Sequence, residues 1–114
     1  MTIFGSFNDE PATEPFPGVF RRTFSTDKVT VTSYAFEPGA SFPTHHHPQE
    51  QSTLVEEGEV TFTVRGVSQE MVAGEWSVVE PHAEHGLTAG PSGARILALI
   101  VPPRETTDEY TISP

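Results

Sequence analysis

Residues 39–58 read GASFPTHHHPQEQSTLVEEG, and this stretch holds three of the five histidines of a 114-residue chain. In an extended strand side chains alternate between two faces, so His45 and His47 project to one side and His46 to the other. Two imidazoles on one face can bind the same metal ion, because imidazole is the commonest metal ligand. The stretch predicts half of a metal site on a strand, with His46 exposed or supporting a ligand.

The other two histidines lie in a second short window, residues 74–85, which reads GEWSVVEPHAEH. A run typical of a strand precedes them, so this window can supply a third imidazole from across a barrel. We expect His85 to be that ligand. His82 lies beside Pro81 and close to His85, which favours a supporting role, since ligating imidazoles usually need a partner that orients them.

Short runs rich in Val, Thr, Phe and Tyr follow one another from Gly18 onward, separated by Gly, Pro or charged pairs. This pattern is typical of strands joined by tight turns, and no segment keeps a helical stripe over ten residues. We therefore predict an all-β sandwich or barrel. The expected strands span residues 19–24, 29–36, 41–45, 52–56, 60–65, 68–72, 76–79, 85–88 and 95–101.

The chain is expected to form one domain with short extensions. Residues 1–17 show no strand or helix period and predict an irregular N-terminal arm, residues 18–103 the barrel, and residues 104–114 a peripheral tail. The run 96–101 is apolar on both faces, so we expect a second layer or subunit to cover it. A homodimer is the simplest arrangement that provides such cover.

Charge and cysteine content exclude several functions. The formal net charge is −10, and the chain has no cysteine. A disulfide framework and a thiolate zinc site are thereby excluded. Nucleic acid and anionic membranes are disfavoured as partners, because both would repel an acidic protein. No apolar run approaches the ~20 residues that span a bilayer, and the N-terminus lacks the basic residues of a signal peptide, so we expect a cytoplasmic protein.

The two histidine windows resemble the two sequence motifs of the cupin superfamily. The first motif has Gly, five residues, His-x-His, three or four residues, Glu, six residues and Gly, and it fits residues 39–58 with Gln51 in place of Glu. The second fits residues 74–85 in spacing. It differs from the family pattern at three positions, where Glu80 replaces Pro, His82 replaces Gly and Ala89 replaces Asn. The resemblance implies a single-domain cupin, an all-β jelly-roll barrel also called a double-stranded β-helix.

The family's metal site falls by position on His45, His47, Gln51 and His85. Strand parity agrees, because Gln51 shares a face with Thr53 and Val55. A one-residue bulge would exchange Gln51 with Glu50, so Glu50 stays an alternative ligand. Nitrogen and oxygen ligands without sulfur suit one divalent ion of Zn, Ni, Fe, Mn or Cu.

Three imidazoles and an amide carry no charge, so a bound divalent ion would keep its full +2 charge and act as a Lewis acid. This favours an isomerase, lyase or cyclase acting on a small polar or anionic metabolite. A metal-dependent dioxygenase of the three-histidine kind is one alternative. A non-catalytic ligand-binding or sensor cupin is another.

Within the superfamily, three segments look like the pectin-degradation cupins that linearise unsaturated uronates: residues 45–51, 81–85 and 102–104. The resemblance implies that Arg104 binds a substrate carboxylate, the alternative being an arginine on the surface. Those cupins carry an acid or base Asp six residues before the Arg, where this chain has Ala98. The uronate reaction is therefore an alternative, weakened by Ala98.

The candidates for moving a proton are Tyr34, His82 and Glu50, with His46 and Glu84 as further possibilities. Neighbouring arginines on the first expected barrel strand provide a second substrate contact, since alternation turns one inward and one outward. We take Arg22 as the substrate-binding candidate, and the alternative is a salt bridge at the rim.

Overall fold

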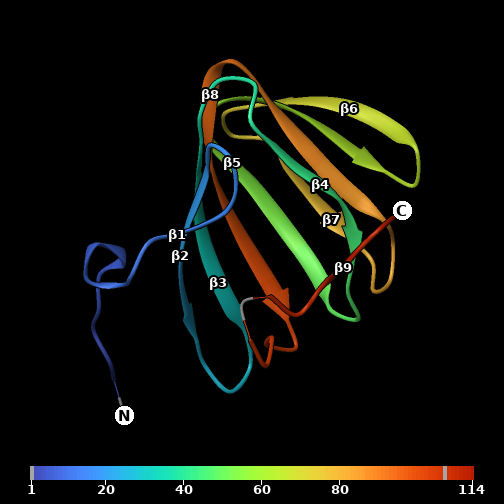
Figure 1. The fold of residues 1–114 in the computed structure, drawn as a ribbon. Coiled ribbons are helices and arrows are strands. Elements are labelled where there is room, and N and C mark those ends of the chain that lie inside the picture. The colour runs from blue at the N-terminus through green and yellow to red at the C-terminus, as the bar shows by residue number, and fades with distance from the viewer. Residues whose placement is uncertain (1, 107) are drawn as a thin grey trace.

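A computed structural model describes residues 2–106 and 108–114, and its strands form one curled nine-stranded sheet (Figure 1). Met1 of the expected arm and Thr107 of the expected tail lie outside the described residues. The all-β jelly-roll prediction is confirmed. The elements are η1 (Phe7–Asp9), β1 (Thr13–Phe16), β2 (Val19–Ser25), β3 (Thr30–Phe36), β4 (Ser41–His46), β5 (Glu50–Val64), β6 (Val67–Val72), β7 (Trp76–Val79), β8 (His85–Val101) and β9 (Thr111–Ile112).

Two long strands, β5 and β8, replace four of the expected short ones. They pair antiparallel from Glu50 opposite Val101 to Val64 opposite His85, and bulges interrupt the register on both sides of Glu57. Bulges bend a strand without ending it, so the Gly and charged residues that suggested turns mark bends instead. The predicted breaks within residues 52–65 and 85–101 were therefore wrong.

Gly58 and Gly93 lie at this bend, and both have a positive φ. A Cβ at Gly58 would lie 2.0 Å from the carbonyl oxygen of Gly93, so only glycine allows the two strands to approach here. The final Gly of the first cupin motif thus has a steric explanation.

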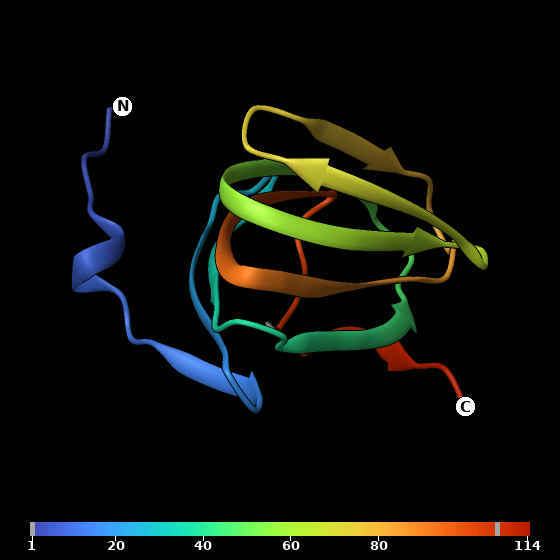
Figure 2. The ribbon, with the colours of Figure 1, turned by 90° about the horizontal axis from the view of Figure 1, so that it is seen from above.

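The barrel closes because β8 pairs with β5 on one side and with two different strands on its other side. The C-terminal half pairs with β3 and the N-terminal half pairs with β4, while β5 also carries β6 and β7. Figure 2 shows the resulting ring of strands, with the N-terminal segment extending away from it. Inward side chains fill the interior with Val19, Tyr34, Phe36, Phe42, Val55, Val60, Phe62, Met71, Val79, Ala83, Leu87, Ala89, Ala94, Ile96 and Ala98.

Both extensions are more ordered than expected. Within the arm, β1 pairs with β2. The tail does not lie apart from the barrel, since β9 pairs with β4 opposite His45 and His46, and Tyr110 packs edge-on against Phe42 with ring centroids 5.3 Å apart. The contact between Tyr110 and Phe42 and the pairing with the edge of β4 hold the C-terminal tail, although its sequence shows no strand pattern of its own. Among the described residues, none of the helical structure has the length and apolar character needed to cross a membrane.

Candidate metal centre

Three imidazoles converge inside the barrel. His45 lies on β4 opposite His85 of β8, and His47 follows β4 directly. Their nearest ligand atoms all lie within 4.8 Å of one another, and all three side chains are buried. His46 is only partly buried and lies opposite Thr111 of β9. The alternation expected for residues 45–47 is thus observed. It places His45 and His47 of the first histidine window beside His85 of the second.

Backbone carbonyls set the protonation of each ring. Nδ1 of His45 lies 2.7 Å from the Pro43 oxygen, and Nδ1 of His85 lies 2.8 Å from that of Ala83. In His47, Nδ1 lies 3.1 Å from a carbonyl oxygen two residues along the chain. A carbonyl oxygen can only accept, so each Nδ1 donates a proton, and each neutral ring keeps a lone pair on Nε2.

Burial keeps these rings neutral. It lowers the pKa of His45 to about 3, with a further contribution from His85. Burial also lowers the pKa of His47 to about 4 and that of His85, and the positive charge of Arg104 acts in the same direction on both. At neutral pH the three Nε2 atoms therefore present lone pairs and no proton.

The Gln51 amide faces the same point. Its Oε1 lies 3.1 Å from Nε2 of His47 and 3.3 Å from Nε2 of His85. Its Nε2 donates to Oγ1 of Thr53 at 3.0 Å, which orients the oxygen toward the imidazoles. Gln51 is buried and Glu50 is exposed, so the side chain that shares the interior with the histidines is Gln51.

The donor set suits a cation. Lone pairs of two imidazole nitrogens and an amide oxygen face one another at hydrogen-bond distance, but none of the three atoms carries a proton to share. A positive ion between them turns this repulsion into coordination. Neutral imidazole and amide donors without sulfur fit a borderline transition ion such as Zn²⁺.

Aromatic rings enclose the three histidines. Phe42 and Tyr110 lie 4.4 and 5.4 Å from the His45 ring, and Phe62 stacks on His85 at 6.2 Å between centroids. Tyr34 helps to line the small cavity that His45, Gln51 and His85 border. This cavity measures about 10 Å³, which is close to what a single water molecule needs.

Two buried arginines lie on the side of the tail. Arg104 is buried, its backbone N–H donates to Oγ1 of Thr30, and its charge lowers the pKa of all three cluster histidines. Of the arginine pair on β2, Arg21 points inward. Arg22 donates to the carbonyl oxygen of Phe7 in the N-terminal segment, so the structure does not bring it to the histidines. Strand parity correctly predicted that the side chains of Arg21 and Arg22 point to opposite faces. The residue that points inward is Arg21, and not Arg22, the substrate-binding candidate selected from the sequence.

The remaining candidates lie outside the cluster. The exposed His82 has φ of 69°, and its backbone N–H donates to the carbonyl oxygen of His47. This position is the Gly of the second cupin motif, and the left-handed backbone explains why glycine suits it. Glu50 and Glu84 are exposed as well, so of the three main proton-carrier candidates Tyr34 is the one beside the histidines.

Comparison with known proteins identifies the family. The model of the cupin domain matches residues 33–101, which is more than half of the chain. The chain is a cupin. The matched segment includes both histidine windows and the strands that carry them, so the predicted resemblance to the superfamily is confirmed.

Several solved structures superpose over nearly the whole chain. An RmlC-like cupin from Shewanella frigidimarina is 26% identical with a TM-score of 0.83, covering 92% of this chain and 95% of that one. KdgF from Halomonas sp. is 23% identical with a TM-score of 0.80, covering 90% and 97%. A Bacillus subtilis oxalate decarboxylase variant is 16% identical with a TM-score of 0.88, covering 95% of this chain but 31% of its own. A search of the curated proteins gives no match.

Proposed function

We propose that this cupin binds one divalent metal ion at His45, His47, Gln51 and His85 and uses it as a Lewis acid on a small polar or anionic metabolite. One observation carries the proposal. Each histidine donates its Nδ1 proton to a backbone carbonyl, so three unprotonated Nε2 atoms face the interior together. When bound, a divalent ion with neutral ligands keeps its full charge and polarises an oxygen of the substrate.

The chain's own residues would orient the substrate. Arg104, whose charge is felt at all three histidines, would pair with a carboxylate through its planar guanidinium. Tyr34, which borders the cavity, is the proposed proton carrier because its hydroxyl can both donate and accept. Isomerase, lyase or cyclase chemistry needs only these parts.

Two other reactions compete with this proposal. The uronate reaction needs a carboxylate where this chain has Ala98, a fully buried residue paired with Thr32 and Thr53. Neither threonine can replace an acid that moves protons at neutral pH. The all-imidazole nitrogen set favours instead, as a second candidate, a three-histidine dioxygenase.

Ligand-dependent stabilisation of Gln51→Ala and Glu50→Ala tests the proposal. Zn²⁺ and Ni²⁺ should raise the melting temperature of the wild type and of Glu50→Ala, and small chelating carboxylates should raise it further only with metal present. Gln51→Ala should lose about tenfold or more in metal affinity. Equal metal affinity in both variants would rule out Gln51 as a ligand, and oxygen uptake with a stabilising ligand would select the dioxygenase.

We also propose a homodimer through the outer face of β7, β5 and β8. Trp76 is 69% exposed, and it lies opposite Leu54, which lies opposite Leu97 on β8. Val78 and Val101 extend this exposed apolar surface, and burial of such a surface favours association.

Replacing Trp76 with Glu should therefore shift the dimer toward monomer, because association would bury an unpaired charge. Light scattering across a dilution series measures the change. Ile3→Glu is the matched control, since Ile3 is also well exposed but lies in the N-terminal segment before η1, outside this face. A wild-type chain that stays monomeric at high concentration would rule out the dimer.

A further inference from the structure

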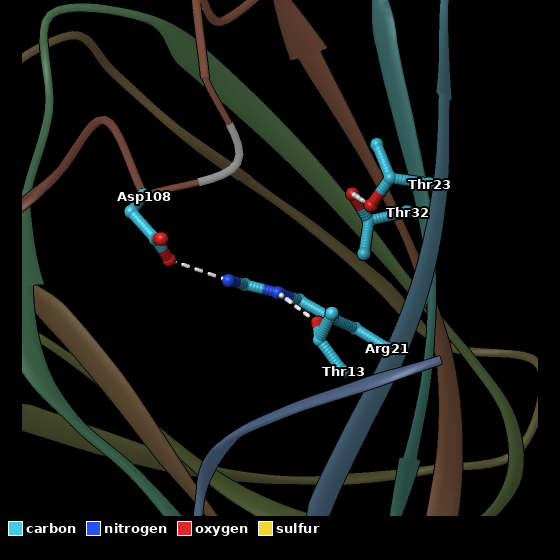
Figure 3. Close-up of polar contacts among 5 residues, drawn as sticks. All are labelled: Thr13, Arg21, Thr23, Thr32 and Asp108. Atoms are coloured by element: carbon cyan, nitrogen blue, oxygen red, sulfur yellow. Dashed lines mark hydrogen bonds and ion pairs between the residues drawn. The ribbon is translucent and has the colours of Figure 1, made fainter. Parts of the chain in front are cut away.

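The C-terminal segment places a carboxylate against a buried arginine of the barrel. Arg21, whose side chain is 4% exposed, donates from Nη2 to Oδ1 of Asp108 at 2.5 Å, as Figure 3 shows. The Asp108 side chain is 70% exposed. A buried cation thus meets an anion that comes from the surface, and Asp108 can leave at low cost only if another anion takes its place, because the buried guanidinium needs an anionic partner.

The strands fix the position of Arg21 independently of Asp108. Thr13 of β1 lies opposite Arg21, and its Oγ1 accepts a hydrogen bond from Nε at 3.2 Å (Figure 3). Tyr34 of β3 lies opposite Arg21 on the other side. The guanidinium is therefore preorganised for a carboxylate, which a planar fork of donors binds well.

Arg21 also lies next to the metal centre. Its neighbour Tyr34 borders the cavity shared by His45 and Gln51. Burial raises the pKa of Tyr110 and the charge of Arg21 acts against this rise, and the ring of Tyr110 lies 5.4 Å from that of His45. A carboxylate on Arg21 would consequently lie one side chain away from the histidines.

In the described part of the tail, polar contacts and one aromatic side chain, Tyr110, cover the histidines. The two-residue β9 pairs with β4, the Ser113 N–H donates to the Thr44 carbonyl, and Gln49 donates to Glu109. The cavity beside the histidines, about 10 Å³, is too small for a metabolite, and Tyr110 of the tail packs against two of its lining residues, Phe42 and His45. Chain termini are among the parts of a protein that open locally, so we take the tail as the part of the wall that can move.

We infer that Arg21 is a carboxylate-binding residue of this site, and that Asp108 occupies the position that a substrate carboxylate takes when the C-terminal segment moves away. This inference rests on the proposed function and narrows the substrate to a small carboxylate. The tail then acts as a lid whose own anion competes with the substrate.

Malonate binding to the zinc-loaded full chain tests this exchange, with malonamide as the uncharged control ligand. Asp108→Asn keeps the shape of the side chain and removes the competing anion. It should tighten malonate binding by about tenfold if the ion pair is formed nine-tenths of the time. Glu105→Gln removes the same charge from an exposed tail position and should change affinity by less than about twofold. Malonamide should bind neither variant better than the wild type.

The double variant Arg21→Gln/Asp108→Asn should lose the gain shown by Asp108→Asn. In the wild type, malonate should speed hydrogen exchange in the peptide 108–114 and malonamide should not, a measurement that does not depend on the folding of any variant. Equal tightening in Asp108→Asn and Glu105→Gln, or unchanged exchange with bound malonate, would overturn the inference. Absence of metal uptake would contradict the proposed function, whereas normal uptake without the Asp108 effect would contradict the role of Arg21 alone.

Discussion

Replacing His85 with alanine is expected to abolish stoichiometric metal binding. The substitution removes one of three imidazoles whose ligand atoms lie within 4.8 Å of one another, and it removes one of the two rings whose Nε2 atoms lie near the Gln51 oxygen. The loss in zinc affinity should exceed about 100-fold, since removing even a partner that only orients a ligand costs 10- to 100-fold. Competition with a chromogenic chelator measures the affinity, and circular dichroism establishes that the barrel is retained.

His46→Ala is the matched control for this experiment. It removes the same side chain from the residue between two proposed ligands, but His46 lies on the other face of β4, opposite Thr111. Its zinc affinity should stay within about twofold of the wild type. Equal losses in His46→Ala and His85→Ala would show that metal binds to surface histidines and not inside the barrel.

Among the substitutions considered, Gly58→Ala is expected to cause the largest loss of stability. The added Cβ would lie 2.0 Å from the backbone oxygen of Gly93, which cannot move without disturbing the pairing of β5 with β8. The positive φ of 77° adds strain for any L side chain. The free energy of unfolding should fall by about 3 kcal/mol or more, measured by urea denaturation.

Gly39→Ala separates the two causes. Gly39 has φ of 74°, nearly the same as Gly58, but no atom lies within 4 Å of the position of its Cβ. Only the conformational cost of about 1–2 kcal/mol should appear. If both variants lose the same free energy, the close approach of the two strands at Gly58 does not limit stability.

Sequence reasoning predicted the histidine cluster because both parts of it are local. Spacing and strand parity place His45 and His47 on one face, and the motif spacing selects His85. The same parity predicts a buried Gln51 beside an exposed Glu50. Within a regular strand, the face on which a side chain lies can be found by counting residues along the chain.

Three features could not be predicted in this way. Parity shows that Arg21 and Arg22 diverge, but the inward residue depends on how β2 pairs with β3, which is a tertiary property. Bulges keep β5 and β8 continuous where Gly and charged residues suggested turns. The return of Asp108 and Tyr110 to the barrel depends on contacts with Arg21 and Phe42, which are more than sixty residues away in the chain.

The metal content of the untagged protein tests the central claim most directly. The chain should be incubated with each candidate ion, desalted, and measured by elemental analysis together with protein concentration. We expect about one divalent ion per wild-type chain, because three neutral imidazoles and an amide oxygen already face one point. Less than about half an equivalent with every ion would contradict the claim that this cupin is a metal-binding protein.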